Sequence, residues 1–255
     1  MNVFDMRVHV KFRSVKSLKR YLCFGCLMLL LVSCSNETVP PPSASLGLIM
    51  DTKVPNFALE AENGTPAEFS TFKGKVVVLV PFLTLCQEVC PITAGALEDV
   101  ENVLKAKNLT NQVEIVEVTV DPERDTPARL RAYSVEFQIS WPLFTGSSTA
   151  LSAMWKYFGI YVQKVPEGSP PGIDWWTGKP LTYDVNHSDG YILLDKNGYE
   201  RFVTTSLPNT GRKLSPSLKK LLDPQGLTNL NSPSGLTWTP NELLSEIGWL
   251  LDKNL

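Results

Sequence analysis

The sequence predicts a domain of mixed α/β structure, with a central β-sheet flanked by helices. An unbroken apolar run from Lys75 to Leu83 is typical of a buried central strand. A valine-rich alternating run follows at 113–120, and a segment with helical apolar spacing lies between the two. Near the end, 191–195 and 199–204 flank a Lys-Asn-Gly turn, which indicates a β-hairpin. Strands separated by helices and closed by a hairpin favour one α/β domain with a mixed sheet.

The shorter elements follow from local patterns. Val54–Leu59 and the Asn-Gly turn at 63–64 predict a strand pair at the entry to the domain. Trp141–Phe144 predicts a short strand, and Thr149–Phe158 predicts a short helix. Residues 163–182 are rich in proline and glycine, so we expect a loop or an insertion there.

Two further helices have recognisable beginnings or faces. Pro127 lies near the first turn of a helix that Asp125 or Thr126 is expected to cap. Glu242–Leu251 predicts a final amphipathic helix. Between them, 209–231 is polar and weakly patterned, so we treat everything from about residue 206 as a C-terminal extension of the domain.

Composition excludes several classes of protein. The chain has 255 residues, is 43% hydrophobic and 20% charged, and shows no collagen-like or coiled-coil bias. The first 33 residues hold six basic side chains and one acidic one, which leaves a net charge of −7 on the remainder. Because contacts to phosphates supply most nucleic-acid affinity, this acidic remainder with no basic stripe argues against a nucleic-acid partner.

The N-terminal segment has the order of parts of a bacterial lipoprotein signal peptide. Twelve mostly apolar residues, 21–32, follow the basic stretch and precede Ser33-Cys34, a sequence that resembles a lipobox. This run is shorter than the roughly 20 residues that span a membrane and suits a signal peptide. We expect cleavage after residue 33, lipidation of Cys34, and a Pro/Ser-rich membrane tether over 34–49. An uncleaved anchor helix is the alternative, and both place the rest of the chain outside the cytoplasm, bound to the membrane.

After this processing, the only cysteines besides Cys34 are Cys86 and Cys90, and the only histidine is His187. A structural disulfide between two thiols four residues apart closes so short a loop that it stabilises little. Redox or metal chemistry is therefore the better interpretation of the pair, with a structural disulfide as the alternative.

The surroundings of the cysteines indicate where they lie. The buried strand ends before Cys86, and Pro91 predicts that a helix begins beside Cys90, with Cys90 as its cap. The partial positive charge at a helix N-terminus stabilises a thiolate. A strand, two thiols and a helix start are typical of the active corner of a thioredoxin-like fold, which we expect over 50–255.

Three segments together resemble the SCO/SenC family of membrane-tethered, thioredoxin-like copper proteins that serve cytochrome c oxidase assembly. They are LTLCQEVCP at 83–91, TVDPERDTP at 119–127 and YDVNHS at 183–188, and the resemblance covers about 50–205. It implies that Cys86, Cys90 and His187 bind copper. Soft thiolates select Cu(I) and imidazole also suits copper, whereas a structural zinc site needs a fourth ligand, which only an Asp or Glu could supply here.

The resemblance implies a copper metallochaperone that delivers copper to the dinuclear copper centre of an oxidase subunit or to another cuproenzyme. The first alternative is an extracytoplasmic thiol–disulfide oxidoreductase with Cys86 and Cys90 as its redox pair. A peroxiredoxin-like peroxidase fits less well, because its Thr-x-x-Cys pattern is missing: Thr84 is two residues before Cys86. A copper sensor or binding module remains as a further alternative.

The chain departs from the family pattern at two places. Gln87-Glu88 replaces Pro-Asp between the cysteines, and Asn186 replaces the usual Asp before the histidine. A stiff loop and a carboxylate that orients the imidazole are therefore missing, which bears on affinity rather than on site identity.

Other chemistry-bearing residues admit a plainer interpretation. Asp121 and Asp125 could form an acid/base pair or an acidic docking surface, but in a Pro-containing turn we expect them to build the turn and cap the helix. Trp175 and Trp176 in the insertion are expected either to anchor a partner or to fold back onto the core.

Overall fold

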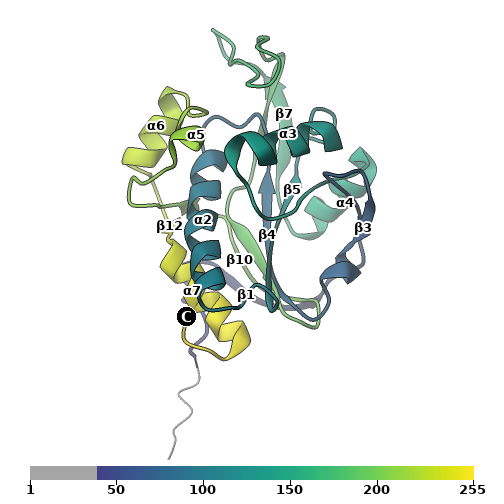
Figure 1. The fold of residues 1–255 in the computed structure, drawn as a ribbon, viewed down its shortest axis with the longest axis vertical. Helices are drawn as coiled ribbons and strands as arrows, with labels where there is room; N and C mark the ends of the chain where they lie inside the picture. The colour runs from purple at the N-terminus through teal and green to yellow at the C-terminus, as the bar shows by residue number, and fades with distance from the viewer. Residues whose placement is uncertain (1–38) are drawn as a thin grey trace, which may run out of the picture. The chain divides into compact units, whose positions relative to one another are not determined.

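The computed structural model describes residues 39–255, and these form the α/β domain that the sequence predicts (Figure 1). The predictions for the signal peptide and for lipidation of Cys34 lie outside the described residues. Within 39–255, no helix is both long and apolar enough to cross a membrane.

The centre of the domain is one mixed sheet of eight strands. Its strands are ordered β1-β10-β9-β4-β5-β6-β2-β3, with β4, β5 and β6 parallel and β9 antiparallel to β4. The bounds of these strands, in chain order, are β1 Leu48–Lys53, β2 Ala58–Ala61, β3 Pro66–Glu68, β4 Val76–Phe82, β5 Val113–Thr119, β6 Leu143–Thr145, β9 Tyr191–Leu194 and β10 Tyr199–Thr204.

All seven residues of β4 are buried, as the unbroken apolar run predicts for a strand covered on both faces. Helices α2 and α7 lie side by side across one face of the sheet (Figure 1). Helices α5 and α6 lie near the N-terminal end of α2 (Figure 1). The helical elements are η1 Phe69–Phe72, α2 Cys90–Ala106, α3 Pro127–Phe137, α4 Ser148–Tyr157, α5 Pro216–Lys219, α6 Pro224–Asn231 and α7 Pro240–Leu251.

The insertion is more ordered than its composition indicates. Val162–Pro166 forms β7, which pairs antiparallel with β8, Tyr183–His187, in a two-stranded arm outside the main sheet. The prediction of a loop over all of 163–182 is therefore wrong at its N-terminal end. The partner strand is remote from β7 in sequence, and pairing with it decides the conformation of these residues more than their own composition does.

The C-terminal extension contains two short helices that the weak apolar pattern does not reveal. Each begins with proline and is capped through a side chain, α5 by Ser215 and α6 by Asp223. Leu218, Leu221 and Leu230 are buried, so the extension packs on the domain. A small parallel pair, β11 Leu207–Pro208 with β12 Thr237–Trp238, joins the residues that precede α5 to those that precede α7. Helix α7 then forms as predicted, with a capping box between Thr239 and Glu242.

Glu246 of α7 gives the domain a testable pH dependence. Its side chain is buried and accepts a hydrogen bond from the Tyr191 hydroxyl of β9, and its Oε1 has no partner among residues 39–255. Burial raises the pKa of Glu246 to about 7. The folded state therefore favours the protonated carboxyl of Glu246. The contribution of this carboxyl to the free energy of unfolding is complete at acidic pH and is lost as the pH rises through about 7.

We predict that Glu246→Gln raises the melting temperature relative to wild type at pH 8, and that the difference shrinks at pH 5. Thermal unfolding followed by circular dichroism at both pH values measures this. The exposed Glu136→Gln is the matched control, with no pH-dependent difference expected. An equal effect of Glu246→Gln at the two pH values would contradict the assignment.

Candidate metal and redox centre

The two cysteines flank the turn that joins β4 to α2. Leu83, Thr84 and Leu85 continue from β4 as buried residues, and Cys86 is the first residue of the turn to reach partial exposure. Cys90 is the first residue of α2 and is 4% exposed. The strand–thiols–helix corner is thus present as predicted, with one thiol open to solvent and the other covered.

The start of α2 differs by one residue from the prediction that Cys90 is the cap. Val89 occupies the N-cap position and provides no side-chain hydrogen bond. The Cys86 sulfur takes over this role, since the backbone N–H groups of Val89 and Cys90 donate to Cys86 Sγ over 3.5 and 3.2 Å. These donors and the positive end of the helix favour the thiolate of Cys86.

His187 ends β8 and is brought to the cysteines by the fold alone. Its Nε2 lies 3.9 Å from Cys90 Sγ, although the two residues are 97 positions apart in the chain. Its Nδ1 lies 2.8 Å from the carbonyl oxygen of Ser188. That carbonyl can only accept, so Nδ1 carries a proton. In the neutral ring the lone pair is then on Nε2, the nitrogen that lies toward Cys90 Sγ.

The three groups have displaced pKa values, with opposite directions for the two thiols. A hydrogen bond from the Cys90 thiol lowers the pKa of Cys86 well below its ordinary value, and His187 acts in the same direction against burial. Burial raises the pKa of Cys90, reinforced by the neighbouring Cys86. For His187, burial lowers the pKa, but the Cys86 thiolate outweighs it and the net shift is upward. Cys86 is therefore the more acidic thiol of the pair.

Asp125 holds the cysteine turn in place, a role that its sequence context did not reveal. Its buried carboxylate accepts hydrogen bonds from Thr84 N over 3.1 Å, from the Thr84 hydroxyl, and from Thr119 Oγ1 over 2.6 Å. Burial raises the pKa of Asp125 to about 6. The predicted capping of α3 belongs to Thr126, whose side chain accepts from Arg129 N. The turn itself forms as expected, since Asp125 N donates to Asp121 O over 2.9 Å. The Asp125 side chain does not cap the helix and instead contacts Thr84, two residues from Cys86.

The same DPERDTP segment, residues 121–127, also holds the strand that carries His187. The Arg124 guanidinium lies 3.8 Å from the ring centroid of Tyr183 and donates to Tyr183 O over 2.7 Å. Asp121 pairs with Arg124 and accepts from the Tyr183 hydroxyl over 3.0 Å. Asp121 and Asp125 face different partners, so they do not form the acid/base pair that was considered.

The tryptophans of the insertion have different surroundings. Trp175 folds back, donating from Nε1 to Thr84 O over 2.8 Å and packing edge-on against Phe137. Trp176 is 47% exposed and lies near Arg129, which forms a buried two-bond ion pair with Asp174. The insertion is therefore fastened both to α3 and to the backbone beside the cysteine turn.

A cleft of about 670 Å³ opens over Cys86 and His187. Among the described residues that line it there are five acidic side chains and no lysine or arginine. The five are Glu88, Glu167, Asp184, Asp189 and Asp223. Such a cleft has a negative potential that attracts cations.

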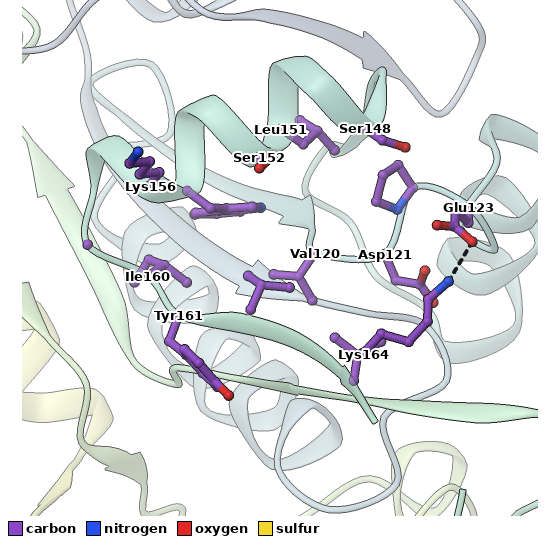
Figure 2. A pocket seen from close by; sticks show the side chains of 15 residues that line it. Val120, Asp121, Glu123, Ser148, Leu151, Ser152, Lys156, Ile160, Tyr161 and Lys164 are labelled. Atoms are coloured by element: carbon purple, nitrogen blue, oxygen red, sulfur yellow. Dashed lines mark hydrogen bonds and ion pairs between the residues drawn. The ribbon is translucent and has the colours of Figure 1, made fainter. Parts of the chain in front are cut away.

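A second cavity, of about 550 Å³, lies between α4 and β7 (Figure 2). Tyr161, Ile160 and Leu151 line it, and the ion pair of Lys164 with Glu123 closes one edge (Figure 2). Neither Cys86, Cys90 nor His187 lines it, so the candidate chemistry belongs to the acidic cleft.

The asymmetry of the thiols predicts their reactivity without any metal. In the reduced protein we expect iodoacetamide to label Cys86 before Cys90 at neutral pH, because Cys86 is partly exposed and has the lowered pKa, whereas Cys90 is buried. His187→Ala should shift the pH midpoint of Cys86 labelling upward, since the imidazole helps to lower that pKa. Peptide mapping by mass spectrometry against pH measures both effects, and Asn186→Ala is the neighbouring control. Preferential labelling of Cys90 would contradict the assignment.

Sequence comparison gives relatives over most of the domain. A SCO1 protein homologue of Bacillus subtilis is 27% identical over 182 residues, covering 70% of this chain and 88% of that protein. A putative copper-binding protein of Stutzerimonas stutzeri is 28% identical over 145 residues, covering 57% of this chain and 65% of that protein.

Solved structures show the same fold. Apo Sco1 of Thermus thermophilus is 27% identical with a TM-score of 0.50, over 72% of this chain and 92% of that one. Bradyrhizobium japonicum ScoI, solved with copper bound, is 23% identical with a TM-score of 0.50, over 70% and 97% of the two chains, and shows the fold alone. The SCO1/SenC family model matches residues 50–222. With its thioredoxin-like fold, the chain therefore belongs to the SCO1/SenC family.

Proposed function

We propose that the protein binds one Cu(I) ion through Cys86, Cys90 and His187 and delivers it to the copper-bearing subunit of a cytochrome c oxidase or to another cuproenzyme. The observation that carries this proposal is the approach of His187 Nε2 to within 3.9 Å of Cys90 Sγ. The relative from Stutzerimonas stutzeri, named as a putative copper-binding protein, supports the choice of metal. Delivery to an oxidase is what the family resemblance implies.

The donor set fits a soft ion with few ligands. Metal–sulfur and metal–nitrogen bonds of about 2.3 and 2.0–2.1 Å, as zinc makes them, allow one ion to bridge a sulfur and a nitrogen that are less than about 4.4 Å apart. The observed 3.9 Å satisfies this limit. Within 39–255, no three His, Cys, Asp or Glu side chains already surround a common ion position. Binding therefore requires a local adjustment of the Cys86 and Cys90 rotamers around the imidazole.

Partial exposure of Cys86 suits transfer by ligand exchange. An incoming thiolate from an acceptor can reach an ion at Cys86 through the cleft, while the buried Cys90 retains the ion from the covered side. The acidic lining of the cleft stabilises a bound cation or a cationic partner.

We predict that the reduced domain binds one equivalent of Cu(I). His187→Ala should weaken binding by about tenfold or more, the cost that is typical of disturbing a metal site, and leave both thiols titratable. Competition with a chromophoric Cu(I) chelator measures the affinity, and Asn186→Ala controls for disturbance of β8. Wild-type affinity in His187→Ala would exclude the three-ligand site.

A second function, thiol–disulfide exchange, is favoured by the unequal thiols. In such a reaction the Cys86 thiolate attacks one sulfur of a partner disulfide, releases the other as a thiolate, and forms a mixed disulfide. Cys90 then attacks Cys86 Sγ, which releases the second, reduced partner thiol and leaves an intramolecular disulfide. The covered Cys90 beside the exposed Cys86 matches these two roles.

Disulfide exchange makes a prediction about the separate roles of the two cysteines. A protein that acts as a reductase should reduce a model disulfide at a rate that Cys86→Ser abolishes. Cys90→Ser should trap the mixed disulfide, which mass spectrometry detects. His187→Ala should lower the rate only to the extent that it raises the pKa of Cys86. Equal loss in all three variants would contradict the assignment of separate roles.

We also propose that the domain functions outside the cytoplasm on a lipid anchor at Cys34. The basic, apolar and Ser-Cys parts of the N-terminal sequence support this location. Metabolic labelling with a radioactive fatty acid, compared with Cys34→Ala, tests it.

A further inference from the structure

The loop between the two cysteines is held from outside by two segments that carry none of the proposed ligands. We propose that helix α6 of the C-terminal extension is a positioning element for the copper and redox centre, with Gly226 as its key residue and the insertion as the opposing support. This inference rests on the proposed function for the copper part, and α6 lies beyond residues 50–222, which the family model matches.

Helix α6 contacts the backbone of the loop. Asp223 N, at the cap of the helix, donates to Gln87 O over 3.0 Å. Asn229, six residues further along, donates from its side-chain Nδ2 to Glu88 O over 3.5 Å. Both carbonyl groups belong to the residues between Cys86 and Cys90, so the helix holds the loop at its main chain rather than at its variable side chains.

Gly226 makes this close approach possible. A Cβ atom at this position would lie 2.3 Å from Gln87 O and 3.1 Å from Glu88 Cα, and both of these are backbone atoms. Glycine is less favourable in a helix than alanine, so its presence needs a reason. Since its backbone is helical and needs no left-handed conformation, contact with the loop is the reason for glycine at this position.

The insertion supports the same loop from the other side. Gln87 Nε2 donates to Ile173 O over 3.0 Å, and Gly172 lies against Gln87 Oε1. Ile173 is next to Asp174, which the buried ion pair with Arg129 fixes to α3. Gln87 is thus held through its side chain by the insertion and through its carbonyl by α6.

The contacts of α6 and of the insertion with the loop influence the hydrogen bonds of the Cys86 sulfur. Cys86 Sγ accepts from the N–H groups of Val89 and Cys90, and that arrangement requires the intervening peptide units to keep their orientation. Because α6 and the insertion both hold the loop, the two sulfurs and the N-terminus of α2 keep their relative positions, although no proline lies between the cysteines. Displacing the loop should therefore change both the thiolate character of Cys86 and the affinity for Cu(I).

The test compares Gly226→Ala with Thr228→Ala, an exposed substitution in the same helix that does not touch the loop. For each reduced protein we would measure the pH midpoint of Cys86 alkylation, the Cu(I) affinity by chelator competition, and the melting temperature. We expect Gly226→Ala to raise the alkylation midpoint and to weaken Cu(I) binding about tenfold, as loss of support around metal ligands typically does. Thr228→Ala should change neither.

The alkylation midpoint and the Cu(I) affinity together distinguish a failure of this inference from a failure of the proposed function. If Gly226→Ala changes the melting temperature but leaves the alkylation midpoint and the affinity at wild-type values, the positioning role is wrong. If wild type binds no Cu(I), the proposed function fails, and the alkylation midpoint alone still decides the role of α6. Should Gly226→Ala not fold, Asn229→Ala, which removes the α6 side chain that donates to Glu88 O, replaces it. Unchanged alkylation and affinity in that variant would overturn the proposal.

Discussion

The buried carboxylate of Asp125 joins the ends of the two central strands, and the geometry of the site depends on that junction. Thr84 follows β4 and Thr119 ends β5, and Asp125 accepts hydrogen bonds from both hydroxyl groups as well as from Thr84 N. A buried carboxylate is stabilised only when such donors surround it, so these bonds form together or not at all. Through Thr84, the position of Cys86 is tied to the ends of the two central strands.

Residues of the same segment, 121–127, also fix the strand that carries His187. Arg124 and Asp121 hold Tyr183 by ring stacking and hydrogen bonds, and Tyr183 begins the strand that ends at His187. The β7–β8 arm is outside the main sheet, and this attachment adds to the burial of Val185 in fixing β8 against the domain. One turn of seven residues therefore sets the distance between thiols and imidazole.

The two cysteines are chemically distinct because their surroundings are distinct. Cys86 is partly exposed and receives backbone N–H groups at a helix start, whereas Cys90 is enclosed. The same asymmetry suits an ion that is held from one side and released at the other, and a dithiol that attacks with one sulfur and resolves with the second. The two proposed activities, copper transfer and disulfide exchange, thus depend on a single arrangement of the thiols.

Much of this molecule could be predicted from local sequence. The buried run of β4, the alternation of β5, the hairpin β9–β10 and the capped helices α3 and α7 each follow from short-range patterns of burial and capping. Both thiols and the lone imidazole could be named as candidates because those side chains have few other uses in this composition. Local patterns do not report what lies across space, and for that reason the strand β7, the turn of Asp125 toward Thr84 and the docking of α6 on the cysteine loop were decided only by the tertiary structure.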